Sequence, residues 1–322
     1  MNPAFLSLSA PTRRDLLSAA AGCLGAAGVP AFAAEPRKVK VSIFTKHLQF
    51  LRGEALATAI ADMGFDGADV TVRTGGHIDP AKAVADLPPL VKLLREHGVQ
   101  VQMVTTGITG ADAPYAEEII RTLSQLDIRY YRVGFVPIDP NRPILGEIEA
   151  LKPKFAQLAA LNSRYQVCGM CHTHSGPALL GASIWDLHLI LKDLDPKWMG
   201  FNYDVGHATV EGGFAGWINS FSLTGQRLRG VGIKDFVWGK DDKGAWRPRW
   251  QPVGAGMVRF PEFFAMLGKT PFSGPLQMSY EYPLGGAESG KQKITIGPQE
   301  VYAAMVRDLK LVRGWLSQNG LG

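Results

Sequence analysis

The stretch FNYDVGHATVEGG, residues 201–213, decides the fold. Its apolar start predicts a short buried strand over residues 200–203, which delivers Asp204 and His207 into a glycine-rich turn. An acid and an imidazole three residues apart, just past a strand end, are able to face one ligand together. Most other chemically unusual residues of the chain also follow a predicted strand, so this stretch is one instance of a repeated unit.

Strand and helix patterns alternate eight times along the chain. The predicted strands cover residues 39–44, 67–72, 99–105, 129–135, 165–171, 200–203, 230–233 and 275–280, and the predicted helices cover residues 54–63, 80–97, 115–126, 147–162, 184–194, 217–228, 261–267 and 299–316. Short strands that alternate with helices indicate a parallel sheet. Eight units without a dinucleotide-binding fingerprint favour a closed (β/α)8 TIM barrel over an open doubly wound sheet. We predict one α/β barrel domain over residues 39–322.

The first 33 residues have the pattern of an export signal. Arg13 and Arg14 form a twin-arginine motif, a weakly apolar run follows over residues 18–29, and residues 31–33 match a signal-peptidase site. We predict a Tat signal peptide over residues 1–33, a linker over residues 34–38, export to the periplasm by the Tat machinery, and no stable membrane anchor. A lipoprotein anchored at Cys23 is the alternative, although residues 20–22 lack the expected leucine.

Composition and cysteine usage exclude several classes of function. The chain has 46% hydrophobic and 20% charged residues, which is ordinary for a globular protein, and its net charge of +5 is spread without a Lys/Arg run. A nucleic-acid partner is therefore not expected. Cys168 and Cys171 form a C-x-x-C pair inside an apolar predicted strand, which favours packing over redox chemistry or zinc binding.

Five of the seven histidines follow predicted strands, namely His47, His77, His172, His174 and His207. In a TIM barrel the loops after the strands form one face, and that face holds the active site. These histidines, together with Arg73 after the second strand, therefore predict a functional rim.

Acidic residues fall on the same predicted rim. Asp204, Glu281 and one of His172 or His174 are able to supply three ligands to a divalent metal (Mn, Zn or Mg). The structural alternative is that Asp204 and Glu281 cap neighbouring helices and pair with Lys234 or Arg73.

A long loop rich in tryptophan and arginine is expected after the seventh strand. Aromatic faces pack on the C–H faces of sugar rings, so Trp246 or Trp250 is a candidate to contact a carbohydrate, with surface packing as the alternative.

These features together resemble the xylose-isomerase-like TIM-barrel superfamily of sugar isomerases and epimerases, in particular its exported, Tat-dependent members. The resemblance covers residues 39–316 and rests on the segments DVTVRTGGH (69–77), CHTHSG (171–176), DVGH (204–207), IKDF (233–236), VGAGM (253–257) and EYP (281–283). It implies a divalent metal at Asp204 and Glu281, with His207 contacting substrate oxygens.

Two positions depart from that superfamily. His172 stands where its members carry a glutamate after strand five, and Gly232 stands where they carry a histidine after strand seven. With these departures, the predicted metal set is His172, Asp204 and Glu281, and Glu281 or Lys234 is the remaining base. The predicted substrate-binding residues of the rim and the tryptophan-rich loop are His47, Arg73, His77, His174, His207, Trp246 and Trp250.

Three functions stay open. The first is a metal-dependent sugar isomerase or epimerase that abstracts a proton next to a carbonyl. The second is a lyase or dehydratase on a 3-keto-sugar or cyclitol, and the third is a non-catalytic sugar-binding barrel. A carbohydrate is the expected partner in each, and a homo-oligomer is left open.

Overall fold

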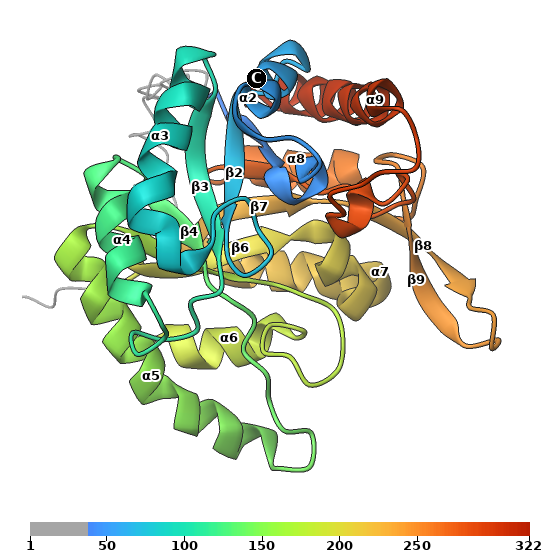
Figure 1. Cartoon of the computed structure of the whole chain (residues 1–322). Coiled ribbons are helices and arrows are strands. Elements are labelled where there is room, and N and C mark those ends of the chain that lie inside the picture. The colour runs from blue at the N-terminus through green and yellow to red at the C-terminus, as the bar shows by residue number, and fades with distance from the viewer. Residues whose placement is uncertain (1–37) are drawn as a thin grey trace, which may run out of the picture. The chain divides into compact units, whose positions relative to one another are not determined.

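The computed structural model describes residues 38–322, and its main body is a closed barrel of eight parallel strands (Figure 1). The strand order is β1-β10-β7-β6-β5-β4-β3-β2. The barrel strands are β1 (Val41–Phe44), β2 (Gly67–Val72), β3 (Gln100–Thr106), β4 (Tyr130–Arg132), β5 (Cys168–His172), β6 (Met199–Asp204), β7 (Leu228–Ile233) and β10 (Leu276–Met278). The predicted (β/α)8 fold is confirmed. The predicted signal peptide and all of the predicted linker except Lys38 lie outside the described residues.

Helices surround the barrel and shield its outer surface from solvent. They are α2 (Gly53–Asp62), α3 (Ala83–Glu96), α4 (Ala116–Gln125), α5 (Ile144–Tyr165), α6 (Ile184–Leu191), α7 (Val205–Thr224), α8 (Phe260–Gly268) and α9 (Pro298–Gln318). Strands β1, β2, β5 and β6 are buried along their whole length, as expected of a parallel sheet covered on both faces. No helix within residues 38–322 has the length and apolar character needed to cross a membrane.

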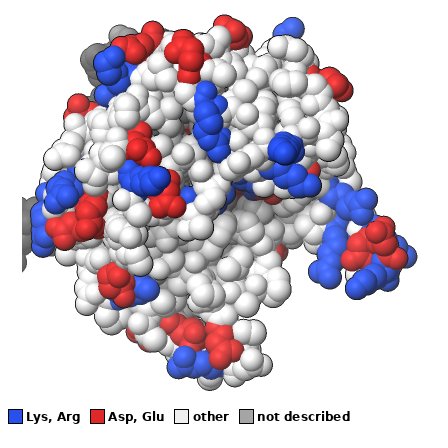
Figure 2. All heavy atoms as spheres, viewed as in Figure 1, with Lys and Arg blue, Asp and Glu red and all other residues white. Residues whose placement is uncertain are grey.

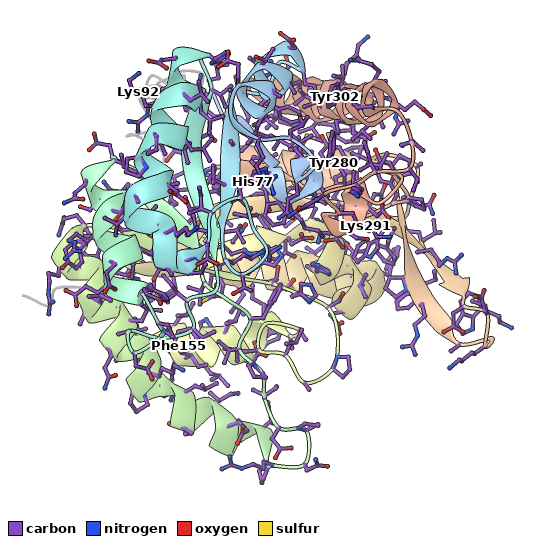
Figure 3. All side chains as sticks on the ribbon, in the orientation of Figure 1. His77, Lys92, Phe155, Tyr280, Lys291 and Tyr302 are labelled. Carbon is purple, nitrogen blue, oxygen red and sulfur yellow. The ribbon has the colours of Figure 1, made fainter. Side chains whose placement is uncertain are left out.

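Aromatic packing and polar contacts fix the outer helices on the barrel. Tyr280, labelled in Figure 3, is fully buried, and its hydroxyl donates a hydrogen bond to the carbonyl of Met305 on α9. Trp315 of α9 stacks on Phe260 and Phe264 of α8 with ring centroids 5.0 and 5.7 Å apart.

Cys168 and Cys171 are buried and unpaired inside β5, where burial raises the pKa of both thiols. The interpretation of this C-x-x-C pair as packing residues is confirmed.

Helix α7 differs from its prediction. We expected a glycine-rich turn after Asp204 and a helix from residue 217, but α7 begins directly at Val205. The Asp204 side chain accepts a hydrogen bond from the backbone N–H of His207 and so caps the helix. The glycine-rich segment forms a kink within α7 in place of the predicted turn, because Gly213 has a φ of 56°, which is not helical.

The tryptophan-rich segment forms a β-hairpin and not an irregular loop. Strands β8 (Asp235–Lys240) and β9 (Trp246–Gln251) pair antiparallel, and Figure 1 shows them projecting from the barrel. The tip is closed by Asp241, whose Oδ1 accepts the backbone N–H groups of Lys243 and Ala245. Figure 2 shows basic and acidic side chains mixed on the hairpin and over the rest of this face, which gives no basic patch for a nucleic acid.

Asp235 at the base of the hairpin explains the glycine-rich segment VGAGM. Its carboxylate accepts backbone N–H groups of four residues, namely Phe236, Gly254, Gly256 and Val258. A β-carbon on Gly256 would lie 2.2 Å from Oδ1 of Asp235, so only glycine fits there. The segment is therefore a turn held by the carboxylate of Asp235.

Asp69 lies inside the barrel without solvent contact. Its Oδ2 accepts hydrogen bonds from Thr105 Oγ1 (2.7 Å) and Gln277 Nε2 (2.8 Å). Burial raises its pKa from 3.8 to about 7, although nearby Arg132 acts in the opposite direction. Between these two values the folded state holds a proton that the unfolded state has lost, so the contribution of Asp69 to stability is present below the unfolded pKa and is lost as pH rises through about 7.

The Asp69→Asn variant tests this sign, because an amide oxygen keeps the acceptor for Thr105 and Gln277. Relative to this variant, the wild type should lose about 2–3 kcal/mol of unfolding free energy between about pH 5 and pH 8. Urea titrations of both proteins across that range measure the difference. A difference that does not change with pH would contradict the protonation of Asp69.

Candidate active site

The carboxyl ends of four adjacent strands bring polar side chains together. His172 ends β5, Asp204 ends β6, Lys234 follows β7 directly, and Glu281 lies beyond the end of β10. Because β10, β7, β6 and β5 are neighbours in the barrel, these ends share one rim. We call these four residues and His207 the rim cluster.

Lys234 is at the centre of the rim cluster. Its Nζ lies 2.8 Å from Nε2 of His207, 3.4 Å from Oδ2 of Asp204 and 3.2 Å from Oε1 of Glu281. The Lys234 side chain is only 4% exposed and that of Asp204 is fully buried, so their attraction acts in a low-dielectric environment. The alternative that Asp204 and Glu281 cap helices and pair with Lys234 or Arg73 is thus partly correct, since both acids pair with Lys234 and Asp204 also caps α7.

Two glycines leave the room that this arrangement needs. A β-carbon on Gly206 would lie 2.5 Å from Cγ of Lys234, and one on Gly232 would lie 2.8 Å from Oδ2 of Asp204. A histidine at position 232 therefore does not fit beside Asp204 as it stands here. This explains the departure at Gly232 in physical terms.

The hydrogen bonds of His207 define its tautomer. Burial lowers its pKa well below the usual value, so the ring is neutral. Because an ammonium only donates, Nε2 accepts from Lys234 and Nδ1 carries the proton that faces Ser175 Oγ at 2.7 Å. The ring is thereby fixed with its lone pair directed at the rim cluster.

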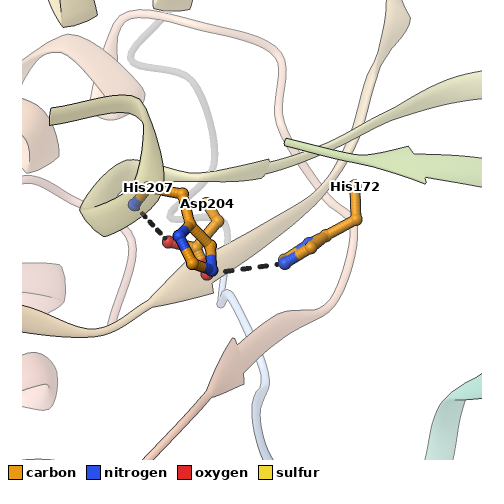
Figure 4. Close-up of side chains that lie close together, drawn as sticks. All are labelled: His172, Asp204 and His207. Atoms are coloured by element: carbon orange, nitrogen blue, oxygen red, sulfur yellow. Dashed lines mark hydrogen bonds and ion pairs between the residues drawn. The ribbon is translucent and has the colours of Figure 1, made fainter. Parts of the chain in front are cut away.

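His172, Asp204 and His207 form the metal-capable group of residues 38–322 (Figure 4). One ligand atom from each lies within 4.8 Å of the others, and all three residues are buried. Both nitrogens of His172 are buried without a hydrogen-bond partner, and Oδ2 of Asp204 has no hydrogen bond beside its 3.4 Å ion pair with Lys234. Such atoms suit a cation. The residues fit a divalent ion, but an ion on Nε2 of His207 would take the lone pair that now accepts from Lys234. Glu281, a predicted ligand, is not in this group, and His207 takes its place.

Glu281 is held by two lysines. Burial raises its pKa, but the ammonium groups of Lys234 and Lys46 outweigh this and bring the pKa down to about 2. Lys46 Nζ lies 3.6 Å from Oε1 of Glu281. Glu281 is therefore a carboxylate at any physiological pH.

His47 was predicted to bind substrate, and the structure uses both of its ring nitrogens internally. Nε2 accepts the backbone N–H of Tyr280 at 3.0 Å, and Nδ1 lies 3.3 Å from the carbonyl of Ala287. The ring is fully buried. His47 is thus a correction to the predicted site, because it joins the ends of β1 and β10 and has no free polar atom for a sugar.

The other predicted histidines and Arg73 have different positions. The His174 ring lies 4.0 Å from that of His207 and so borders the rim cluster. His77, labelled in Figure 3, lies in the loop after β2 with Nδ1 3.2 Å from Thr71 Oγ1. Arg73 is half-buried over the ring of Phe44 at 5.6 Å.

Trp250 and Trp246, the two tryptophans predicted to contact a sugar, lie at opposite ends of the hairpin. Trp250 lies at the base of the hairpin, with its ring 5.1 Å from that of His207 and 5.1 Å from Nζ of Lys234. Trp246 pairs with Lys240 at the hairpin tip and is 62% exposed. Trp250 therefore borders the rim cluster, whereas the prediction for Trp246 is corrected because antiparallel pairing carries it to the far end of the hairpin.

Sequence reasoning missed three residues of the rim, namely Lys46, Ser175 and Arg132. Lys46 and Ser175 each directly adjoin a predicted site histidine, so their position was a usable signal. Arg132 was placed inside a predicted strand over residues 129–135, and only the early end of β4 at Arg132 puts it on the rim.

A closed parallel barrel with its polar cluster at the carboxyl ends of the strands defines a TIM-barrel protein with an enzyme-like rim. The chain belongs to the xylose isomerase-like TIM barrel family, whose model matches residues 57–300. No curated protein gives a significant match to the sequence.

Several solved structures are similar in fold. The IolI protein with a bound zinc atom has a TM-score of 0.67 at 12% identity, covering 86% of this chain and 99% of that chain. A 3-keto-D-glucoside 4-epimerase from E. coli has a TM-score of 0.62 at 17% identity, covering 86% and 100%. A D-tagatose 3-epimerase-like protein has a TM-score of 0.60 at 16% identity, covering 86% and 99%. At these identities the likeness establishes the fold.

Metal binding should depend on the three converging residues. After reconstitution with zinc or manganese, the wild type should hold about one ion per chain, and His172→Ala and Asp204→Ala should each lose it. Inductively coupled plasma mass spectrometry measures the metal content. His97→Ala is the matched control, because His97 directly follows α3 and is not one of the three converging residues. A metal-free wild type, or an Asp204→Ala variant that retains the ion, would contradict the site.

Proposed function

We propose that the protein is a sugar isomerase or epimerase that abstracts a proton from the carbon next to a carbonyl. The observation that carries this proposal is the contact of the Lys234 ammonium with the Glu281 carboxylate at 3.2 Å. A carboxylate and a cation side by side on a barrel rim supply a base and the group that stabilises the resulting oxyanion. Membership of the xylose isomerase-like family supports the same class of reaction.

Each residue has a defined task in this mechanism. Glu281 takes the proton, and the C–H electron pair moves to form the enediolate while Lys234 donates to its oxygen. Glu281 then returns the proton to the former carbonyl carbon, and the hydroxyl proton passes to the former carbonyl oxygen, which completes a one-base isomerisation. While both lysines pair with it, Glu281 is a weak base, and a substrate oxygen that draws Lys234 away raises its basicity.

A divalent metal on His172, Asp204 and His207 would supply Lewis-acid polarisation of a substrate oxygen. Two imidazoles and one carboxylate favour zinc over magnesium, which prefers oxygen ligands. His207 would then exchange its contact with Lys234 for the ion, leaving Lys234 on Glu281.

Elimination from a 3-keto-glycoside is the second candidate, because it begins with the same proton abstraction. It is favoured by the single carboxylate base, since His172 replaces the second glutamate that a two-base epimerisation needs. Incubation with a 3-keto-glycoside separates the two: an aglycone signal in the proton NMR spectrum identifies a lyase, and a new sugar isomer without aglycone identifies an isomerase. Binding without any product would leave a sugar-binding barrel.

We also propose export to the periplasm by the Tat route, supported by Arg13 and Arg14 in the leader pattern. Cell fractionation tests this, with Arg13→Lys/Arg14→Lys as the variant expected to stay in the cytoplasm. A wild-type protein found only in the cytoplasm would contradict it.

A further inference from the structure

Two arginines on the other side of the rim are not used by the proposed mechanism. Arg132 is the last residue of β4 and is only 5% exposed, while Arg73 follows β2 and is half-buried. Their guanidinium carbons lie 5.3 and 5.6 Å from the centre of the same Phe44 ring. Arg132 also lies 5.1 Å from the ring centre of Phe135. Two cations therefore contact the same aromatic side chain at the barrel mouth.

Neither guanidinium is paired within the part of the chain that the structure describes. No carboxylate oxygen among residues 38–322 lies within 4.0 Å of either group, and Nε of Arg132 is buried without a hydrogen-bond partner. A guanidinium carries five N–H donors in a planar fork, and a buried charge without a counter-ion is costly. The contacts with the rings of Phe44 and Phe135 are cation–π contacts and use none of the guanidinium N–H groups as hydrogen-bond donors. These N–H groups therefore remain available to a ligand.

Asp69 cancels this charge only in part. Asp69 is the acid with the largest influence on Arg132, but its Oδ2 is occupied by Thr105 and Gln277, and burial raises its pKa to about 7. Burial lowers the pKa of Arg132 to about 10, so the guanidinium is charged at neutral pH. This side of the mouth therefore keeps excess positive charge.

The arginines are close to the rim cluster. Phe135, whose ring contacts Arg132, lies 6.4 Å from the ring of His172 and 4.6 Å from that of His174. The Phe135 ring thus connects Arg132 to His172, a member of the rim cluster.

We propose that Arg73 and Arg132 form an anion site for a carboxylate or phosphate group of the substrate, so that the protein acts on an anionic sugar. This inference rests on the proposed isomerase function for the identity of the reacting end. Planar N–H forks bind carboxylate and phosphate oxygens in bidentate fashion, and a low-dielectric mouth strengthens that contact. The anion would supply the counter-charge that the described residues lack and would orient the carbonyl toward Lys234.

Simple anions test the site without knowledge of the sugar. Thermal unfolding of the full-length chain is followed in inorganic phosphate, in acetate and in chloride at equal ionic strength, for the wild type, Arg132→Met, Arg73→Met and the exposed control Arg121→Met. The wild-type melting temperature should rise by about 2–4 °C in phosphate or acetate relative to chloride. Both rim variants should lose this rise, and Arg121→Met should keep it. A larger rise in acetate identifies a carboxylate site, and a larger rise in phosphate identifies a phosphate site.

A wild type that melts equally in all three salts would overturn the proposal, as would a rise that persists in both rim variants. Arg132→Met should also melt above the wild type in chloride, because it removes an uncompensated buried charge, and Arg73→Met provides the answer if Arg132→Met does not fold. The proposed reaction fails separately. If the anions stabilise the protein but no keto-sugar exchanges its proton, the anion site is supported and the proposed reaction is contradicted. If neutral sugars exchange their protons and phosphate does not inhibit this exchange, the reaction is supported and the anion site is contradicted.

Discussion

Replacing Glu281 by glutamine should lower the rate of proton exchange at the carbon next to the substrate carbonyl by about 10²–10⁴-fold. The amide keeps the size of the side chain and an oxygen for Lys234 at the 3.2 Å contact, but it cannot take a proton. Steady-state rates and substrate affinity should therefore separate, with kcat falling and KM changing little.

Glu262→Gln on α8 is the matched control, because Glu262 pairs with Arg259 and not with a residue of the rim cluster. It should leave the rate unchanged. A Glu281→Gln protein that exchanges protons at the wild-type rate would assign the base to another residue, and Lys234 would be the first candidate.

Replacing Lys234 by methionine should reduce the same rate by about 10²–10³-fold, because the oxyanion loses the ammonium group that contacts Glu281, Asp204 and His207. The pKa of Glu281 should rise at the same time, since Lys234 is the charge that lowers it most. The acidic limb of the pH–rate profile should consequently move to higher pH, a change that a purely structural role would not produce.

Lys46→Met separates the two effects of charge. Lys46 also lowers the pKa of Glu281 but has no ion pair with Asp204. This variant should shift the pH–rate profile in the same direction while keeping most of the activity. Equal losses of activity in both lysine variants would contradict a specific role of Lys234 as the oxyanion partner.

Periodicity was sufficient to predict the barrel because each strand–helix unit repeats the same pattern of burial. Strands such as β6, buried over all six of its residues, are covered on both faces and appear in sequence as short apolar runs. The hairpin β8–β9 was missed because, beyond Asp235 and Phe236, its residues are partly or fully exposed and form no continuous apolar run. Its pairing moves Trp246 far from the base, where Trp250 contacts His207.

The candidate site was predicted in position but not in its contacts. Strand ends located His172, Asp204, Lys234 and Glu281, because a parallel barrel places all such ends on one rim. The metal-capable group contains His207 in place of the predicted Glu281, because the hydrogen bond from the backbone N–H of His207 to Asp204 at the start of α7 orients His207. His47 was indistinguishable in sequence from the other rim histidines, since its role follows from hydrogen bonds to Tyr280 and Ala287 far along the chain.

Deuterium incorporation from heavy water into a panel of neutral and anionic keto-sugars tests the central claim most directly. Proton NMR should show loss of the signal from the hydrogen next to the carbonyl with the wild type, and no loss above background with Glu281→Gln. Retention of that hydrogen with every sugar, by a protein that is folded and metal-reconstituted, would contradict proton abstraction at this rim.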